Sequence, residues 1–183
     1  MPLMTDVEAV FNDQTEEYEL VFTGSEINGH NSILEDIDVF VGGEKQPVIS
    51  SSDTEVRVQI KSLKGGEGRE AIDLFYPKGI ARGLESYIGG VDFEPALVSV
   101  SAPEGSIAGS EIEATVPGIG VDDGERFTLV NMANNEVVCD SVRIEEYGKL
   151  KCNTTAGGDF EAGIELGIMD TTNGTVYDCK AAN

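Results

Sequence analysis

The chain is a succession of short apolar or alternating runs separated by clusters of Gly, Asn, Asp, Ser and Pro. These runs cover residues 18–23, 36–41, 54–60, 71–76, 96–101, 111–116, 126–131, 136–140, 149–153, 163–169 and 175–179. Their length and their content of β-branched and aromatic residues are typical of β-strands. Within 54–60, Val56, Val58 and Ile60 alternate with polar residues, which predicts an antiparallel strand with one buried face. Strands that recur at such short intervals predict an all-β fold of the sandwich type.

The same order of features occurs twice along the chain. In each half, a strand, a turn and a second strand precede a polar loop, a third strand, a Gly-Gly turn and a fourth strand. A repeat of about 90 residues has the size of an immunoglobulin-like domain. Gly89, Gly90 and Pro95 supply a break between the halves. The sequence therefore predicts two tandem immunoglobulin-like β-sandwiches, residues 1–92 and 93–183.

The charge of the chain excludes several classes of protein. The 34 acidic and 12 basic residues give a formal net charge of −22. Residues 1–92 hold 18 acids and 7 bases and residues 93–183 hold 16 and 5, so each half carries −11. Such a surface repels nucleic-acid phosphates and anionic membranes. No apolar run reaches the ~20 residues of a membrane-spanning helix, and a single histidine, His30, excludes histidine-rich metal centres.

The segment that starts at Pro95 resembles the beginning of an IPT/TIG domain, the immunoglobulin-like module of plexins, scatter-factor receptors and fibrocystin-like proteins. The matching residues are Pro95, Val98, Val100, Ser101, Pro103, Gly105, Ser106, Gly109, Ser110, Ile112, Val116, Gly118 and Gly120. The first half is similar at 39–43 and 79–81. The resemblance implies a repeat-built segment of a longer extracellular or cell-surface chain.

The chain has three cysteines, all in the second half, and two of them are placed to form a disulfide. Cys139 and Cys152 fall on two successive predicted strands, where neighbouring backbones are close enough for a disulfide. At the corresponding positions the first half has Pro47 and Val58, so both cysteines are replaced together. We predict a Cys139–Cys152 disulfide; the alternative is a pair of buried thiols in a cytosolic protein. Cys179 is either an inert strand residue or a link to another chain.

Two N-glycosylation triplets begin at Asn153 and Asn173. In secreted proteins such triplets mark surface loops. The second triplet also contains an Asn-Gly pair, which is typical of a hairpin turn. Both asparagines are candidate glycosylation sites.

An acidic loop in the second half is a candidate calcium site. Asp122, Asp123 and Glu125 cluster in one polar loop, and calcium prefers carboxylate oxygens. The alternative is a solvated loop on a very acidic protein. Calcium is the only cofactor that the sequence suggests.

The motifs of common catalytic sites are missing. There is no nucleophile elbow, no phosphate-binding loop and no zinc-protease helix motif. We therefore expect no enzyme, but a structural or adhesion segment, a spacer or filament part, that binds proteins or neighbouring copies of itself through sheet faces and edges. The alternatives are a carbohydrate- or ligand-binding accessory module of a secreted protein, and an enzyme whose site no motif reveals.

Overall fold

The structure is a computed structural model that describes residues 3–27, 37–66, 70–75, 85–101, 109–155 and 165–179. The predicted all-β fold is confirmed, because the described strands form four antiparallel sheets of four strands each. The described residues contain no helix long and apolar enough to span a bilayer. The chain divides into two compact units: unit 1 is Met1–Leu63 with Gly68–Phe93, and unit 2 is Lys64–Glu67 with Glu94–Asn183.

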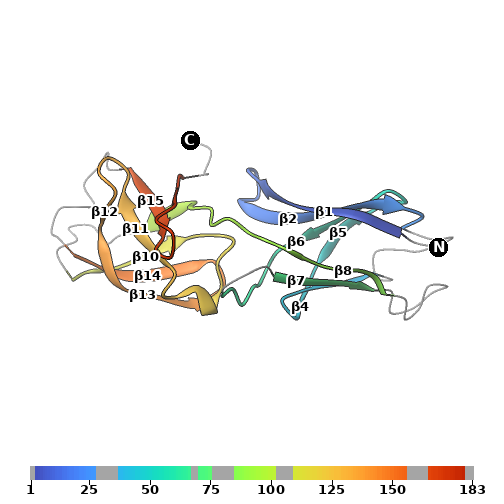
Figure 1. Ribbon diagram of the computed structural model, residues 1–183. Coiled ribbons are helices and arrows are strands. Elements are labelled where there is room, and N and C mark those ends of the chain that lie inside the picture. The colour runs from blue at the N-terminus through green and yellow to red at the C-terminus, as the bar shows by residue number, and fades with distance from the viewer. Residues whose placement is uncertain are drawn as a thin grey trace. The chain divides into compact units, whose positions relative to one another are not determined.

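Unit 1 consists of two layers of strands (Figure 1). One sheet has the order β1 (Leu3–Asn12), β2 (Glu17–Ser25), β6 (Glu55–Gln59) and β5 (Val48–Ser51). The other has the order β4 (Glu44–Gln46), β3 (Asp38–Val41), β7 (Glu70–Phe75) and β8 (Glu85–Val91).

The period-2 pattern of the sequence sets the core of unit 1. In β6, Val56 and Val58 are fully buried, and the residues on either side of them are only partly buried. These two valines lie opposite Phe22 and Leu20 of β2, which are also fully buried. Side chains of alternate residues point to one face of a strand, so this register places the apolar residues of both strands on the inner face of the sheet.

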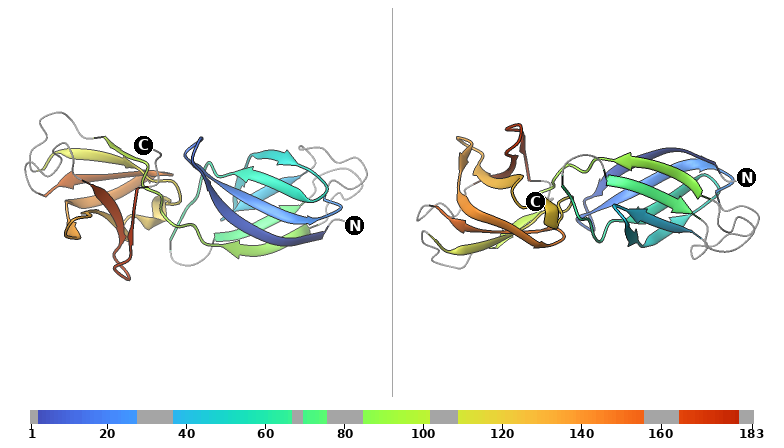
Figure 2. Two further views of the ribbon diagram at one scale, coloured as in Figure 1. Left: turned by 90° about the horizontal axis from the view of Figure 1, so that it is seen from above. Right: turned by 60° about the horizontal axis from the view of Figure 1, so that its bottom comes forward.

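Unit 2 repeats this architecture, as a second view shows (Figure 2). One sheet has the order β13 (Cys139–Glu146), β14 (Lys149–Thr154), β10 (Glu111–Thr115) and β9 (Ser99–Ser101). The other has the order β12 (Glu136–Val137), β11 (Phe127–Asn131), β15 (Leu166–Asp170) and β16 (Val176–Tyr177). A 3₁₀ helix, η2 (Val121–Asp123), precedes β11.

The two units share one strand order. Numbered within its own unit, each has strands 1-2-6-5 in one sheet and 4-3-7-8 in the other. This arrangement corresponds to the ABED and C′CFG sheets of immunoglobulin-like sandwiches. The division into units differs from the expected boundary chiefly at Lys64–Glu67, which belongs to unit 2. The reason is a set of hydrogen bonds to η2 that sequence patterning does not reveal.

A disulfide joins Cys139 of β13 to Cys152 of β14, with a Cα–Cα distance of 5.7 Å. Both cysteines are buried in the core of unit 2, beside residues such as Leu129 and Leu150. Cys139 lies opposite Thr154 in the strand register. The bridge therefore runs diagonally across the two strands and does not join directly opposed residues.

We expect the disulfide to make a large contribution to the stability of unit 2. Replacing both cysteines, Cys139→Ala with Cys152→Ala, should lower the free energy of unfolding by about 3 kcal/mol, because the bridge closes a loop of 13 residue steps. Denaturant unfolding measures this difference. The exposed Cys179 provides the control, since Cys179→Ala should change stability by less than about 0.5 kcal/mol. Equal stability of the double variant and the wild type would contradict the expectation.

Candidate functional site

Buried carboxylates are the natural place to look for chemistry in this chain. Burying a charge is costly unless it is paired, and strongly perturbed groups gather at functional sites. Among the described residues, the buried acids are Glu19 in unit 1 and Asp123 and Asp170 in unit 2. The partners of each carboxylate decide whether it is free to act on a ligand.

Asp123 is the last residue of η2 and is 2% exposed. Its Oδ1 accepts a hydrogen bond of 2.7 Å from the backbone N–H of Gly66, and its Oδ2 accepts one of 2.8 Å from the N–H of Gly120. Beside it, the N–H of Asp122 donates to the carbonyl of Lys64 at 2.7 Å. These bonds attach the segment Lys64–Gly66 to η2, so the carboxylate acts as a fixed acceptor for backbone amides.

Arg126 connects the two buried acids of unit 2. Its Nε donates to Oδ2 of Asp170 at 3.1 Å, and its Nη1 lies 3.8 Å from Oδ1 of Asp123. The same Nη1 donates to the carbonyl of Gly66 at 3.1 Å. The guanidinium also lies over the ring of Phe127, 4.9 Å from the ring centroid, which is a favourable cation–π arrangement. One partly exposed arginine thus lies within ion-pair distance of both buried carboxylates of unit 2.

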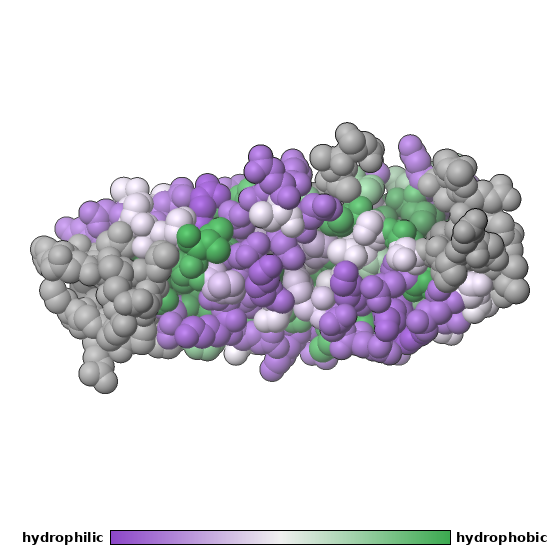
Figure 3. Space-filling model, turned by 180° about the vertical axis from the view of Figure 1, so that it is seen from behind, coloured by the Kyte–Doolittle hydropathy of each residue, from purple (hydrophilic) through white to green (hydrophobic). Residues whose placement is uncertain are grey.

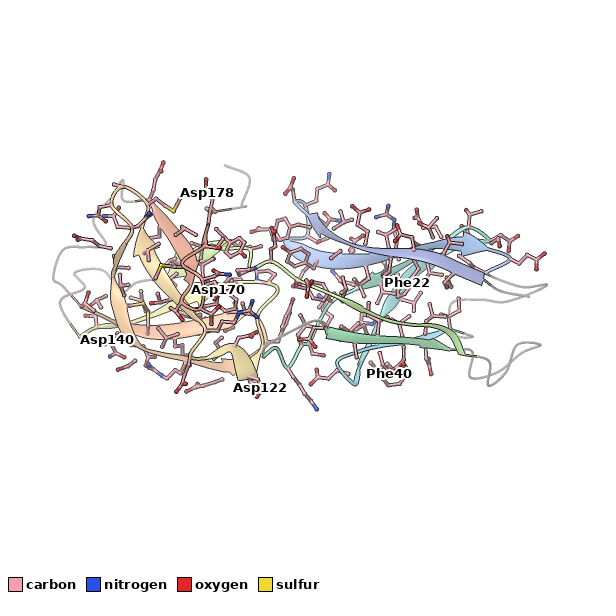
Figure 4. All side chains as sticks on the ribbon, viewed as in Figure 1. Phe22, Phe40, Asp122, Asp140, Asp170 and Asp178 are labelled. Atoms are coloured by element: carbon pink, nitrogen blue, oxygen red, sulfur yellow. A yellow bond between two sulfur atoms is a disulfide. The ribbon has the colours of Figure 1, made fainter. Side chains whose placement is uncertain are left out.

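Asp170 ends β15 and begins the turn that leads to β16 (Figure 4). Its Oδ1 accepts hydrogen bonds from the N–H of Thr172 at 2.9 Å and from the hydroxyl of Thr172 at 2.5 Å. Its Oδ2 accepts from Arg126. Both oxygens of this carboxylate are therefore hydrogen-bonded within the fold, and the residue is 1% exposed.

The pKa values of the two aspartates shift in opposite directions. Burial dominates at Asp123 and raises its pKa, although the N–H groups of Gly120 and Gly66 and the charge of Arg126 oppose the shift. At Asp170 burial also raises the pKa, but hydrogen bonds from Thr172 and Arg126 outweigh it, and the pKa is lowered. A lowered pKa keeps Asp170 ionised at neutral pH, as its pairing with Arg126 requires.

In unit 1, Glu19 is held in the same manner. Its Oε2 accepts a hydrogen bond of 2.8 Å from Nδ2 of Asn12, and its Oε1 accepts one of 3.2 Å from Nη1 of Arg57. Asn12 belongs to β1 and Arg57 to β6, the two strands on either side of β2. Glu19 therefore ties three neighbouring strands together.

The three carboxylates of the loop that we predicted to bind calcium lie in different environments. Asp122 and Glu125 are exposed, whereas Asp123 is buried and bonded to backbone amides. Within the part of the chain that the structure describes, no three His, Cys, Asp or Glu side chains gather closely enough to hold a metal ion. Calcium binding at Asp122, Asp123 and Glu125 stays a prediction.

The remaining predicted site residues lie in unit 2. Cys179 is an exposed free thiol whose backbone forms an isolated parallel bridge with Leu97. Asn153 lies on β14, a strand with a neighbour on each side, and Asn173 lies in the turn between β15 and β16. Neither asparagine nor Cys179 contacts the carboxylates through a hydrogen bond of the described residues.

Sequence reasoning did not find the network of Asp123, Arg126 and Asp170. Forty-four positions separate Arg126 from Asp170, and a single sequence carries no sign of their pairing. The one available signal was the pair Gly65-Gly66, because adjacent glycines permit the positive φ angles, +74° and +105°, that bring this backbone to Asp123.

Comparison with known proteins identifies no family for this chain. No protein-family model and no curated protein matches the chain. Similar solved structures include the full extracellular region of plexin A4, with 11% identity, a TM-score of 0.33 and coverage of 97% of this chain and 15% of that chain. They also include a chain crystallised with a xylogluco-oligosaccharide, with 12% identity, a TM-score of 0.33 and coverage of 100% and 41%.

A third similar structure is the surface glycan-binding protein PbSGBP-B from Prevotella bryantii, with 12% identity, a TM-score of 0.35 and coverage of 97% and 41%. The chain thus spans less than half the length of each of these three proteins. The fold defines it as an all-β protein of two sandwich-like units. The IPT/TIG resemblance stays a prediction.

Gly65 offers a test of the role of Asp123. A Cβ atom on Gly65 would overlap the carboxylate of Asp123, whereas a Cβ on Gly174 would have no atom within 4 Å. Their φ angles, +74° and +76°, are nearly equal, so replacement by alanine costs both positions the same backbone strain of about 1–2 kcal/mol. We expect Gly65→Ala to lower the free energy of unfolding of unit 2 by about 1–3 kcal/mol more than Gly174→Ala does. Equal losses in denaturant unfolding would show that Asp123 does not hold this segment.

Asp170 should make the stability of unit 2 depend on pH. Because its pKa is lowered in the folded state, its contribution is present above the ordinary value of 3.8 and is lost as the pH falls through the lowered pKa. Asp170→Asn should therefore cost about 1.5–3 kcal/mol near pH 7, and this deficit should shrink in acid. Denaturant unfolding across pH measures it.

The control is Glu145→Gln, which removes an exposed ion pair with Lys151 and should cost much less than Asp170→Asn does. A deficit of Asp170→Asn that stays constant down to the acid limit of folding would contradict the assigned role.

Proposed function

We propose that this chain is a non-enzymatic segment of an extracellular protein, in which two immunoglobulin-like sandwiches act as a spacer and bind protein partners through a sheet edge. The observation that carries the proposal is the use made of the buried carboxylates. Glu19, Asp123 and Asp170 all accept hydrogen bonds from groups that hold strands and loops in place. None of these three is left poised to move a proton to or from a substrate.

The disulfide supports an extracellular location. Disulfides persist in oxidising compartments and are rare in the cytosol, where thiols are kept reduced. Cys139 and Cys152 are both buried in the core of unit 2, so the bridge belongs to the folded unit itself. A structural bridge of this kind is expected in a protein that folds during export.

The charge of the surface supports a partner with a basic surface. In Figure 3, hydrophilic side chains cover much of the described surface in view, and the hydrophobic areas between them are small and separate. The exposed large hydrophobic residues of the described ranges, Val10, Ile49, Val121 and Val137, come from different strands and loops. With a net charge of −22, the favoured partner is a protein with a basic surface, and self-association is opposed by repulsion.

The most extensive edge available to such a partner is β1. This strand is ten residues long, and among the described strands it forms a ladder only with β2. On its other side lies β8 (Glu85–Val91), the edge strand of the second sheet, with which it forms no ladder, so β1 is an edge strand. Asp6 and Glu8 are exposed along it, and its register shifts between Met4 and Asp6. Charges and a bulge on an edge strand discourage pairing with another acidic copy and leave a basic partner strand as the better match.

Site-specific photo-cross-linking in the cells of origin tests this proposal. A photoreactive amino acid at Val10, exposed on β1, should form an adduct with another protein outside the cell. The matched control is the same amino acid at Thr23, which is exposed on the central strand β2 and should give little adduct. Equal labelling at both positions, or tight binding to an oligosaccharide on a glycan array, would overturn it in favour of a carbohydrate-binding accessory module.

A further inference from the structure

The two N-glycosylation triplets have different structural settings. Asn153 lies on β14, opposite Glu111 of β10 on one side and Asp140 of β13 on the other. Asn173 lies in the exposed turn that joins β15 to β16. The settings matter because a transferase must reach the side-chain nitrogen of the asparagine and the hydroxyl two residues later.

Both the nitrogen and the oxygen of the Asn153 carboxamide form hydrogen bonds within the fold. Its Nδ2 donates a hydrogen bond of 2.9 Å to the carbonyl of Gly109, and its Oδ1 accepts one of 3.1 Å from Nη1 of Arg143. Arg143 is in turn paired with Glu111, which lies directly opposite Asn153. An oligosaccharide on Nδ2 would have to displace these contacts on a strand that has neighbours on both sides.

Asn173, in contrast to Asn153, lies in an exposed turn. Residues 171–175 are all exposed, and a Cβ placed on Gly174 would meet no atom within 4 Å. The Oδ1 of Asn173 accepts a hydrogen bond of 2.9 Å from the N–H of Thr175, which draws the first and third residues of the triplet together. No hydrogen bond of the described residues uses Nδ2 of Asn173 or the hydroxyl of Thr175.

Hydrogen bonds to Asp170 stabilise the turn that contains Asn173. The carbonyl of Asp170 accepts from the N–H of Gly174 at 2.8 Å, and its N–H donates to the carbonyl of Thr175 at 2.8 Å. Its side chain also accepts from the N–H and the hydroxyl of Thr172. The network of buried charges described above therefore fixes the turn that displays Asn173.

We propose that Asn173 carries an N-linked oligosaccharide and that Asn153 does not, an inference that rests on the extracellular location proposed above. The co-reactant is an oligosaccharide linked to a lipid through pyrophosphate. Nδ2 of Asn173 forms a bond to the anomeric carbon, the bond from that carbon to the pyrophosphate oxygen breaks, and the lipid pyrophosphate leaves with the electron pair. Nδ2 loses one proton to a base of the transferase, and no group is oxidised or reduced.

A glycan at this position also restricts where partners bind. The turn between β15 and β16 lies at one end of the sheet β12-β11-β15-β16. A hydrated, bulky group there excludes protein partners from that end of unit 2. Such partners must use other surfaces of the chain, of which the β1 edge of unit 1 is the one proposed above.

The experiment is to recover the chain from outside the cells of origin and to measure its intact mass before and after an amidase that removes N-linked glycans. We expect one glycan, retained in Asn153→Gln and lost in both Asn173→Gln and Thr175→Ala. The number of free thiols, one in the native chain, verifies that each variant has formed the disulfide.

A glycan on Asn153, or an exported and disulfide-bonded chain with no glycan on Asn173, would overturn this inference and leave the proposed function intact. A chain found only inside the cell, with all three thiols free, would instead overturn the proposed extracellular function.

Discussion

The structure depends on one constraint, which is that each of its four sheets must bury one face. Alternating residues in strands such as β6 place Val56 and Val58 inside and leave charged or polar residues outside. The burial of apolar surface is the main favourable term in folding, and it forces a very acidic chain to put almost all of its charge on outer faces and loops. The few carboxylates that remain inside must then find partners.

In unit 2, Arg126 is the positively charged partner of the buried carboxylates. It contacts Asp123 and Asp170, which lie on segments that are distant in sequence, while backbone amides and Thr172 satisfy the remaining acceptors. Removing one member of such a network leaves an uncompensated buried charge, which is more costly than the intact network is favourable. The network therefore holds the segments that contain its members, including the turn with Asn173.

Different parts of the structure were accessible to sequence reasoning to very different degrees. The period-2 pattern and the turn residues are local signals, so the all-β fold and strands such as 54–60 could be predicted. The attachment of Lys64–Glu67 to unit 2 and the pairing of Arg126 with Asp170 are long-range contacts with no local signal. For the same reason the acidic loop looked like three equivalent carboxylates, although burial distinguishes Asp123 from Asp122 and Glu125.

The central claim is that the carboxylates of Asp123 and Asp170 are buried and are held by backbone amides, Thr172 and Arg126. A carbon-detected NMR titration of the aspartate carboxyl groups in the native chain tests it most directly. The account predicts that Asp170 titrates below the ordinary value of 3.8 and Asp123 above it. If both carboxyl groups titrated at the ordinary value, as solvent-exposed aspartates do, the account would be contradicted.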